Sequence, residues 1–129
     1  MGRKIIKTDK APAAIGPYSQ GVVVNNIVYT SMQIPLDPLT GDLIGKTAGE
    51  QIKQCLENIN NIIIAAGADI NDVVKTTVYL TDINQFNDVN EIYSGYFSDN
   101  PPARGVIEVS ALPKGALIAV EAIAQVNKS

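Results

Sequence analysis

The chain contains no histidine and no tryptophan, and its 129 residues include a single cysteine, Cys55. Without histidine there is no Ser-His-Asp or Cys-His triad, no histidine-ligated zinc and no histidine general base. With one cysteine, the chain forms no internal disulfide and no thiolate metal cluster. Any proton transfer must therefore use carboxylate, tyrosine, lysine, backbone or water.

Charge and long apolar runs are also scarce. Only 18% of the residues are charged, and the net charge is −3, which argues against a broad nucleic-acid-binding surface. Apolar stretches such as 62–67 fall far short of the roughly 20 residues that a membrane helix needs. A secretory signal requires an apolar segment after its basic N-terminus, and no such segment is present here. We therefore expect one compact cytoplasmic domain over residues 1–129, with no membrane span.

Hydrophobic periodicity predicts strands and helices in alternation. Asn25 and Asn26 tolerate positive φ and mark the turn of a hairpin. The helical spacing after Thr47 places Cys55 on an apolar face, where a buried and inert thiol is expected. Thr81 or Asp82 is expected to cap a second helix. In chain order the predicted elements are a hairpin, a loop, a helix, a strand, a helix and two strands, at 21–31, 34–45, 47–67, 72–80, 81–100, 103–109 and 117–126.

The order β-β-α-β-α-β-β predicts an α+β domain, in which two helices cover one face of a mixed sheet. We expect the other face to include Val120, Ala122 and Ala124. A monomer would leave that apolar surface wet. Self-association would bury it, so the sequence predicts a closed homo-oligomer.

Arg104 stands in the run Pro-Pro-Ala-Arg-Gly-Val-Ile-Glu-Val, residues 101–109, at the start of what reads as a buried strand. Its planar fork of N–H donors can match both oxygens of a carboxylate, which suggests a small anionic ligand. The alternative is a surface or interface salt-bridge residue. Spacing alone favours that alternative, because arginine is rarely buried without a partner.

Several blocks of the chain resemble one known family. They are found at residues 11–21, 30–35, 74–78, 102–104, 112–114 and 120–121. These blocks are similar in sequence and order to the YjgF/RidA family of reactive-intermediate deaminases. The resemblance implies a chorismate-mutase-like fold and a homotrimer with an inner barrel and clefts between subunits. It also implies hydrolysis of 2-imino or enamine acids, such as 2-iminobutanoate and 2-iminopropanoate, to 2-keto acids and ammonia, with no metal or organic cofactor.

Carried over residue by residue, the resemblance implies a substrate site. Arg104 would clamp the substrate carboxylate, and the backbone carbonyl of Val106 would help to position water. Tyr18 would lie near the ligand, Ser31 would line the pocket, and Asn90 would lie near the cleft. Simple interface packing is an equal alternative for Tyr18, and a local hydrogen bond is an equal alternative for Ser31. For Asn90 a structural role is favoured.

Two positions depart from the family pattern. Ala119 stands where the typical deaminase has a water-handling glutamate, and Met32 replaces a common glycine. Glu121 points to the same side of a regular strand as Ala119 and could serve instead, although a structural role is favoured. The interpretation as a deaminase therefore has an alternative, which is a non-catalytic small-carboxylate-binding or regulatory trimer. A third reading, the endoribonuclease label of some relatives, has little support in a histidine-free, acidic chain.

Overall fold

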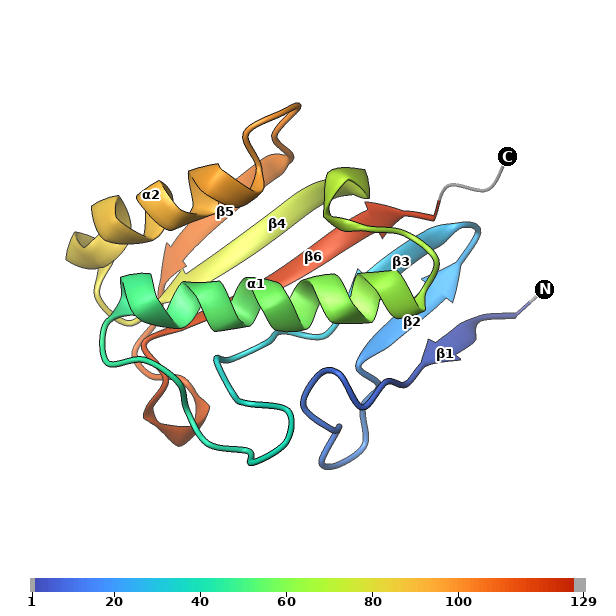
Figure 1. Ribbon diagram of the computed structural model, residues 1–129, viewed down its shortest axis with the longest axis horizontal. Coiled ribbons are helices and arrows are strands. Elements are labelled where there is room, and N and C mark those ends of the chain that lie inside the picture. Colours follow the sequence, from blue (N-terminus) through green and yellow to red (C-terminus); the bar gives the residue numbers. More distant parts are fainter. Residues whose placement is uncertain (1, 127–129) are drawn as a thin grey trace.

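A computed structural model describes residues 2–126 and forms one sheet covered by two helices. The strand order is β1-β2-β3-β6-β4-β5, and β4 and β5 are parallel while the other neighbours are antiparallel. Both helices lie on the same face (Figure 1). This arrangement confirms the predicted α+β fold. The elements are β1 Lys4–Ile6, β2 Gly21–Val24, β3 Ile27–Thr30, α1 Ala48–Ala65, β4 Val73–Leu80, α2 Phe86–Tyr96, β5 Ala103–Glu108 and β6 Ile118–Gln125.

Helix α1 follows from local signals at both ends and a buried stripe between them. The Thr47 hydroxyl accepts a hydrogen bond from the Glu50 backbone N–H at 3.1 Å, and Gly67 adopts a φ of 96° just beyond the helix. Cys55 lies on the buried stripe, as expected, with no exposed surface. Its thiol faces the Ile118 carbonyl at 3.8 Å, and burial raises the pKa of the thiol well above its usual value. The reactive thiolate is therefore strongly disfavoured.

The turn between β2 and β3 and the segment before α2 contain the turn and capping residues that the sequence predicted. Asn25 and Asn26 have φ values of 50° and 63°, so the expected hairpin turn between β2 and β3 is confirmed. Of the two expected caps, Asp82 accepts a hydrogen bond from the Asn84 backbone N–H at 3.0 Å. That bond caps a short 3₁₀ turn, Ile83–Gln85, which leads into α2.

The sequence analysis missed β1. This strand has only three residues, and only Ile6 among them is buried. Such a short segment shows no periodicity of its own, and its strand character comes from antiparallel pairing with β2. Among the helices that the structure describes, none has the length and apolar character needed to cross a membrane.

The face assigned to the apolar residues of β6 was wrong. Val120, Ala122 and Ala124 belong to the core beneath the helices, so they do not lie on the open face. Alternation along a strand shows that these residues share a face, but it does not show which face meets the helices. The exposed apolar side chains of the open face include Tyr29 on β3 and Ile107 on β5, which are 46% and 48% exposed.

Candidate functional site

Arg104 lies on β5, which is an edge strand and not the buried strand that the sequence suggested. Its side chain is exposed, and Nη1 donates a hydrogen bond to the Asn90 Oδ1 at 2.8 Å. This is its one hydrogen bond to the residues that the structure describes. A guanidinium carries five N–H donors, so most of its binding capacity is free.

Helix α2 supplies the surroundings of this guanidinium. The carbon Cζ lies 5.0 Å from the centre of the Phe86 ring and 4.8 Å from that of Tyr93. The Tyr93 hydroxyl shares a buried hydrogen bond of 2.7 Å with Thr76 Oγ1. Burial raises the pKa of Tyr93, while the bond to Thr76 and the charge of Arg104 act in the opposite direction. The sequence analysis assigned neither Phe86 nor Tyr93 to the site.

The backbone of β5 presents Val106 at the open edge of the sheet. The Val109 N–H donates to the Leu80 carbonyl at 2.8 Å, so residues 105, 107 and 109 direct their backbone groups toward β4. Residues alternate along a strand, and the carbonyl of Val106 therefore points away from β4. The side chain of Val106 lines a small hollow together with Ile83 and Phe86.

Ser31 lies at another part of the molecule and bonds to residues 19 and 20, which directly follow Tyr18. Ser31 Oγ donates to the Ser19 carbonyl at 2.5 Å, and the Ser31 N–H donates to the Gln20 carbonyl at 2.8 Å. The local hydrogen bond considered for Ser31 is therefore present. Tyr18 is 51% exposed, and its hydroxyl accepts a bond from the Ile15 N–H at 3.3 Å.

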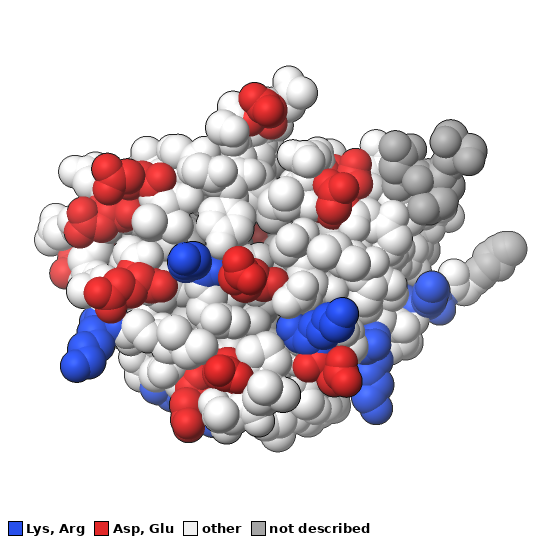
Figure 2. All heavy atoms as spheres, viewed as in Figure 1, with Lys and Arg blue, Asp and Glu red and all other residues white. Residues whose placement is uncertain are grey.

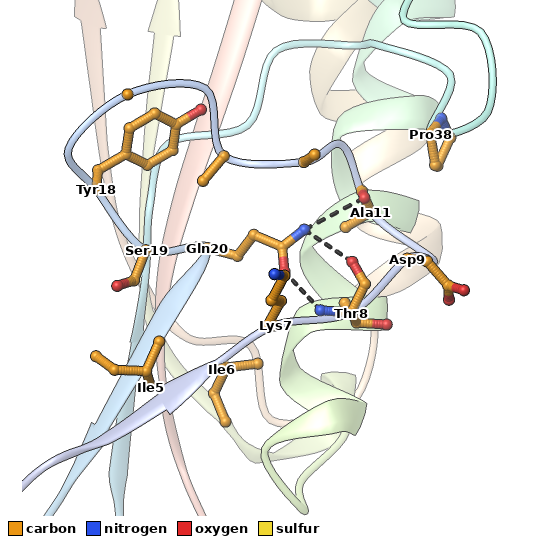
Figure 3. Close-up of a pocket in the computed structure, with 13 residues that line it drawn as sticks. Ile5, Ile6, Lys7, Thr8, Asp9, Ala11, Tyr18, Ser19, Gln20 and Pro38 are labelled. Carbon is orange, nitrogen blue, oxygen red and sulfur yellow. Dashed lines mark hydrogen bonds between the residues drawn. The ribbon is translucent and has the colours of Figure 1, made fainter.

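Gln20, which the sequence analysis did not single out, organises this loop. Its side chain is almost fully buried, and Oε1 accepts a bond from the Thr8 N–H at 2.7 Å. Nε2 donates to the carbonyls of Thr8, Ala11 and Pro12 at 2.9, 3.2 and 2.8 Å. Figure 3 shows Gln20 reaching across to the N-terminal segment, beside a hollow of about 820 Å³ that Tyr18 also lines.

The predicted site residues thus form two groups that are far apart within one chain. Cross-strand neighbours place Thr30, Ala122, Thr76 and Arg104 in one row across β3, β6, β4 and β5. Three strand spacings separate the ends of this row, or about 14 Å. Ser31 follows directly after Thr30. A ligand of three or four carbons therefore cannot contact Arg104 and Ser31 of the same chain.

Glu121 lies on the open face of the sheet, whereas the Arg104 side chain lies on the helix-covered face. The cross-strand partner of Glu121 is Thr77, whose partner on β5 is Gly105. The Glu121 carboxylate accepts a hydrogen bond from the Tyr79 hydroxyl at 3.1 Å. Burial, together with this bond and the charge of Glu121, raises the pKa of Tyr79. Glu121 points to the same side as Ala119, which has no exposed surface.

Charged side chains are scattered over the molecule. On the helix-covered face, Figure 2 shows acidic and basic groups interspersed, without a continuous basic stripe among the described residues. Within residues 2–126, no group of three or more histidine, cysteine, aspartate or glutamate side chains is placed to hold a metal ion.

Comparison with known proteins shows close similarity along nearly the whole chain. A family model described as Endoribonuclease L-PSP matches residues 8–126. The human protein named 2-iminobutanoate/2-iminopropanoate deaminase is 54% identical over 122 residues, which cover 95% of this chain and 89% of the human one. The structure of E. coli TdcF with bound serine has a TM-score of 0.91 and 42% identity, and the match covers 98% and 99% of the two chains. RidA from an Antarctic Psychrobacter has a TM-score of 0.91 and 46% identity, with 95% and 98% covered.

Proposed function

Because the chain belongs to the Endoribonuclease L-PSP family, which includes the YjgF/RidA deaminases, we propose that it hydrolyses 2-imino acids to 2-keto acids and ammonia. The substrates would be small, such as 2-iminobutanoate and 2-iminopropanoate. The observation that carries the proposal is the state of Arg104. An exposed guanidinium with one hydrogen bond to the described protein is equipped to take a carboxylate.

The reaction requires few proton-transfer groups from the protein. Arg104 would hold the carboxylate and thereby fix the position of C2. A water oxygen would attack C2 of the protonated imine, giving a carbinolamine after loss of a proton. Collapse of that intermediate, with protonation of the nitrogen, would release ammonia and form the keto group. The edge carbonyl of Val106 can accept a hydrogen bond from the attacking water.

The site would be completed by a second copy of the chain. Arg104 and Ser31 are about 14 Å apart by strand spacing, so both can serve one ligand only across a subunit interface. The exposed apolar residues of the open face, Tyr29 and Ile107 among them, favour association through that face. We therefore propose a homotrimer whose clefts join Arg104, Val106 and Asn90 of one subunit to Tyr18 and Ser31 of the next. Light scattering on the purified protein tests the trimer.

A second candidate function is binding of small carboxylates without turnover. It is favoured by Ala119, which supplies no carboxylate where the typical deaminase has glutamate. Glu121 points to the same side of β6 as Ala119, but it lies two residues further along the strand and its carboxylate already accepts a hydrogen bond from Tyr79. Under this alternative the trimer would bind a keto acid and report its concentration to a partner. The cytoplasmic location expected from the sequence belongs to both candidates, and cell fractionation tests it.

The deciding experiment generates imine in the presence of the protein. A threonine dehydratase releases 2-aminocrotonate and 2-iminobutanoate, and semicarbazide traps the remaining imine. We expect the protein to lower semicarbazone formation and to speed formation of 2-ketobutyrate, and Arg104→Ala to abolish both effects. If the folded oligomer binds 2-ketobutyrate but does not accelerate the reaction, the binding alternative is supported. If the folded oligomer neither accelerates the reaction nor binds 2-ketobutyrate, both candidates are refuted.

A further inference from the structure

We propose that Phe86 and Tyr93 are positioning residues for Arg104. Their rings would hold the guanidinium in one orientation, so that a fixed edge of it faces the ligand. This inference rests on the proposed function, because it assigns a purpose to the clamp. Neither aromatic residue would touch the substrate, and both would act through Arg104.

The spacing of α2 places the guanidinium between the two rings. Phe86, Asn90 and Tyr93 are separated by four and three residues, so they share one face of the helix. Seven helical residues span about 10.5 Å. The carbon Cζ of Arg104 is 5.0 Å from one ring centre and 4.8 Å from the other, and Nη1 bonds to Asn90 between them.

The Tyr93 ring is itself held firmly. Its hydroxyl shares a hydrogen bond of 2.7 Å with Thr76, whose side chain is 1% exposed, and its ring centre lies 4.6 Å from that of Phe97. Thr76 is also the cross-strand partner of Arg104. The ring is therefore anchored to the same pair of strands that carries the guanidinium. A rotation of Arg104 about its side-chain bonds would lose its contact with the face of the ring.

The contacts leave a defined edge of the guanidinium available. Asn90 accepts from Nη1, while Nε and Nη2 carry two parallel N–H groups along the neighbouring edge. That edge matches the two oxygens of a carboxylate. A long side chain loses rotamer freedom when it binds a ligand, and a side chain that is already held loses less. The rings would therefore strengthen binding of the carboxylate without taking part in the chemistry.

The test replaces each ring in turn and measures binding and turnover separately. Phe86→Leu and Tyr93→Leu remove a ring, Tyr93→Phe keeps it, and Tyr96→Leu makes the same change on α2 away from Arg104. By calorimetry, we expect each ring loss at Phe86 or Tyr93 to weaken binding of 2-ketobutyrate roughly two- to fivefold. The same two variants should raise KM for the imine and leave kcat unchanged. Tyr93→Phe keeps the ring but loses its bond to Thr76, so it should weaken binding less than Tyr93→Leu does. Tyr96→Leu should bind within a factor of two of the wild type.

A spectroscopic signal reports the position of Arg104 without any ligand. In the wild-type protein, the Arg104 Nε–H resonance should show an upfield shift caused by the aromatic rings. Phe86→Leu and Tyr93→Leu should each reduce that shift, and Tyr96→Leu should leave it unchanged. Tyr93 is buried, so its leucine variant tests the inference only if it folds. Phe86 is half-buried and carries the test on its own.

The outcomes separate this inference from the proposed function. If the wild type binds 2-ketobutyrate but Phe86→Leu binds equally well, the positioning role is refuted and the deaminase proposal stands. If the wild type binds without hydrolysis, the deaminase proposal fails, and weaker binding by Phe86→Leu still supports the positioning role. If Phe86→Leu lowers kcat and leaves both KM and the Arg104 resonance unchanged, the rings do not act through Arg104. If the wild type neither binds 2-ketobutyrate nor hydrolyses the imine, both proposals are overturned.

Discussion

Replacing Arg104 by lysine isolates the geometry of the guanidinium from its charge. Arginine can give a carboxylate two parallel N–H bonds, whereas the lysine ammonium is a point charge that makes one bond at a time. The lysine would also lose the bond to Asn90 and the orientation between the rings of Phe86 and Tyr93. Loss of one charge-assisted hydrogen bond costs about 1.5 to 3 kcal/mol, so Kd for a 2-keto acid should rise about tenfold to 150-fold.

Calorimetric titration with 2-ketobutyrate at low ionic strength measures this change directly. The other arginine of the chain, Arg3, provides a matched control, because Arg3→Lys makes the same exchange at an exposed N-terminal position. Arg104 is exposed, so the free energy of unfolding of Arg104→Lys should stay within about 1 kcal/mol of the wild type. A Kd for Arg104→Lys within twofold of the wild type, with Arg3→Lys also unchanged, would show that the carboxylate is not bound by a two-bond clamp at Arg104.

Two further predictions concern stability. Gln20→Leu should lower the free energy of unfolding by roughly 2 to 4 kcal/mol, because four hydrogen bonds to the N-terminal segment are lost; urea denaturation measures the change, and a loss below about 0.5 kcal/mol would contradict this role. Burial and the hydrogen bond to Glu57 raise the pKa of Tyr96 from 10.0 to about 12, so the neutral hydroxyl stabilises the fold fully below pH 10 and this contribution is lost as the pH rises through 12. Unfolding measured between pH 9 and 12 should therefore show a steeper loss of stability for the wild type than for Tyr96→Phe, and parallel curves would contradict the prediction.

The local features of the fold could be predicted because their causes are local. The helix expected over 47–67 and the turn at Asn25 and Asn26 depend on residues within a few positions of one another. In the structure Thr47 caps the first turn of that helix, and Gly67 follows its last turn with a positive φ. The family resemblance was also confirmed, since it depends on the order of blocks along the chain. β1 was missed because three residues carry too little pattern, and its pairing with β2 makes it a strand.

For the candidate site, the order of residues was enough to identify Arg104 as a candidate clamp and to exclude assistance by a histidine. The surroundings of Arg104 depend on how the chain folds. The edge position of β5, the contact with Phe86 and Tyr93, and the face on which Val120 lies all depend on the order of strands in the sheet and on where α1 and α2 pack. Periodicity shows which residues share a face, but contacts between distant segments are set by the packing of whole elements.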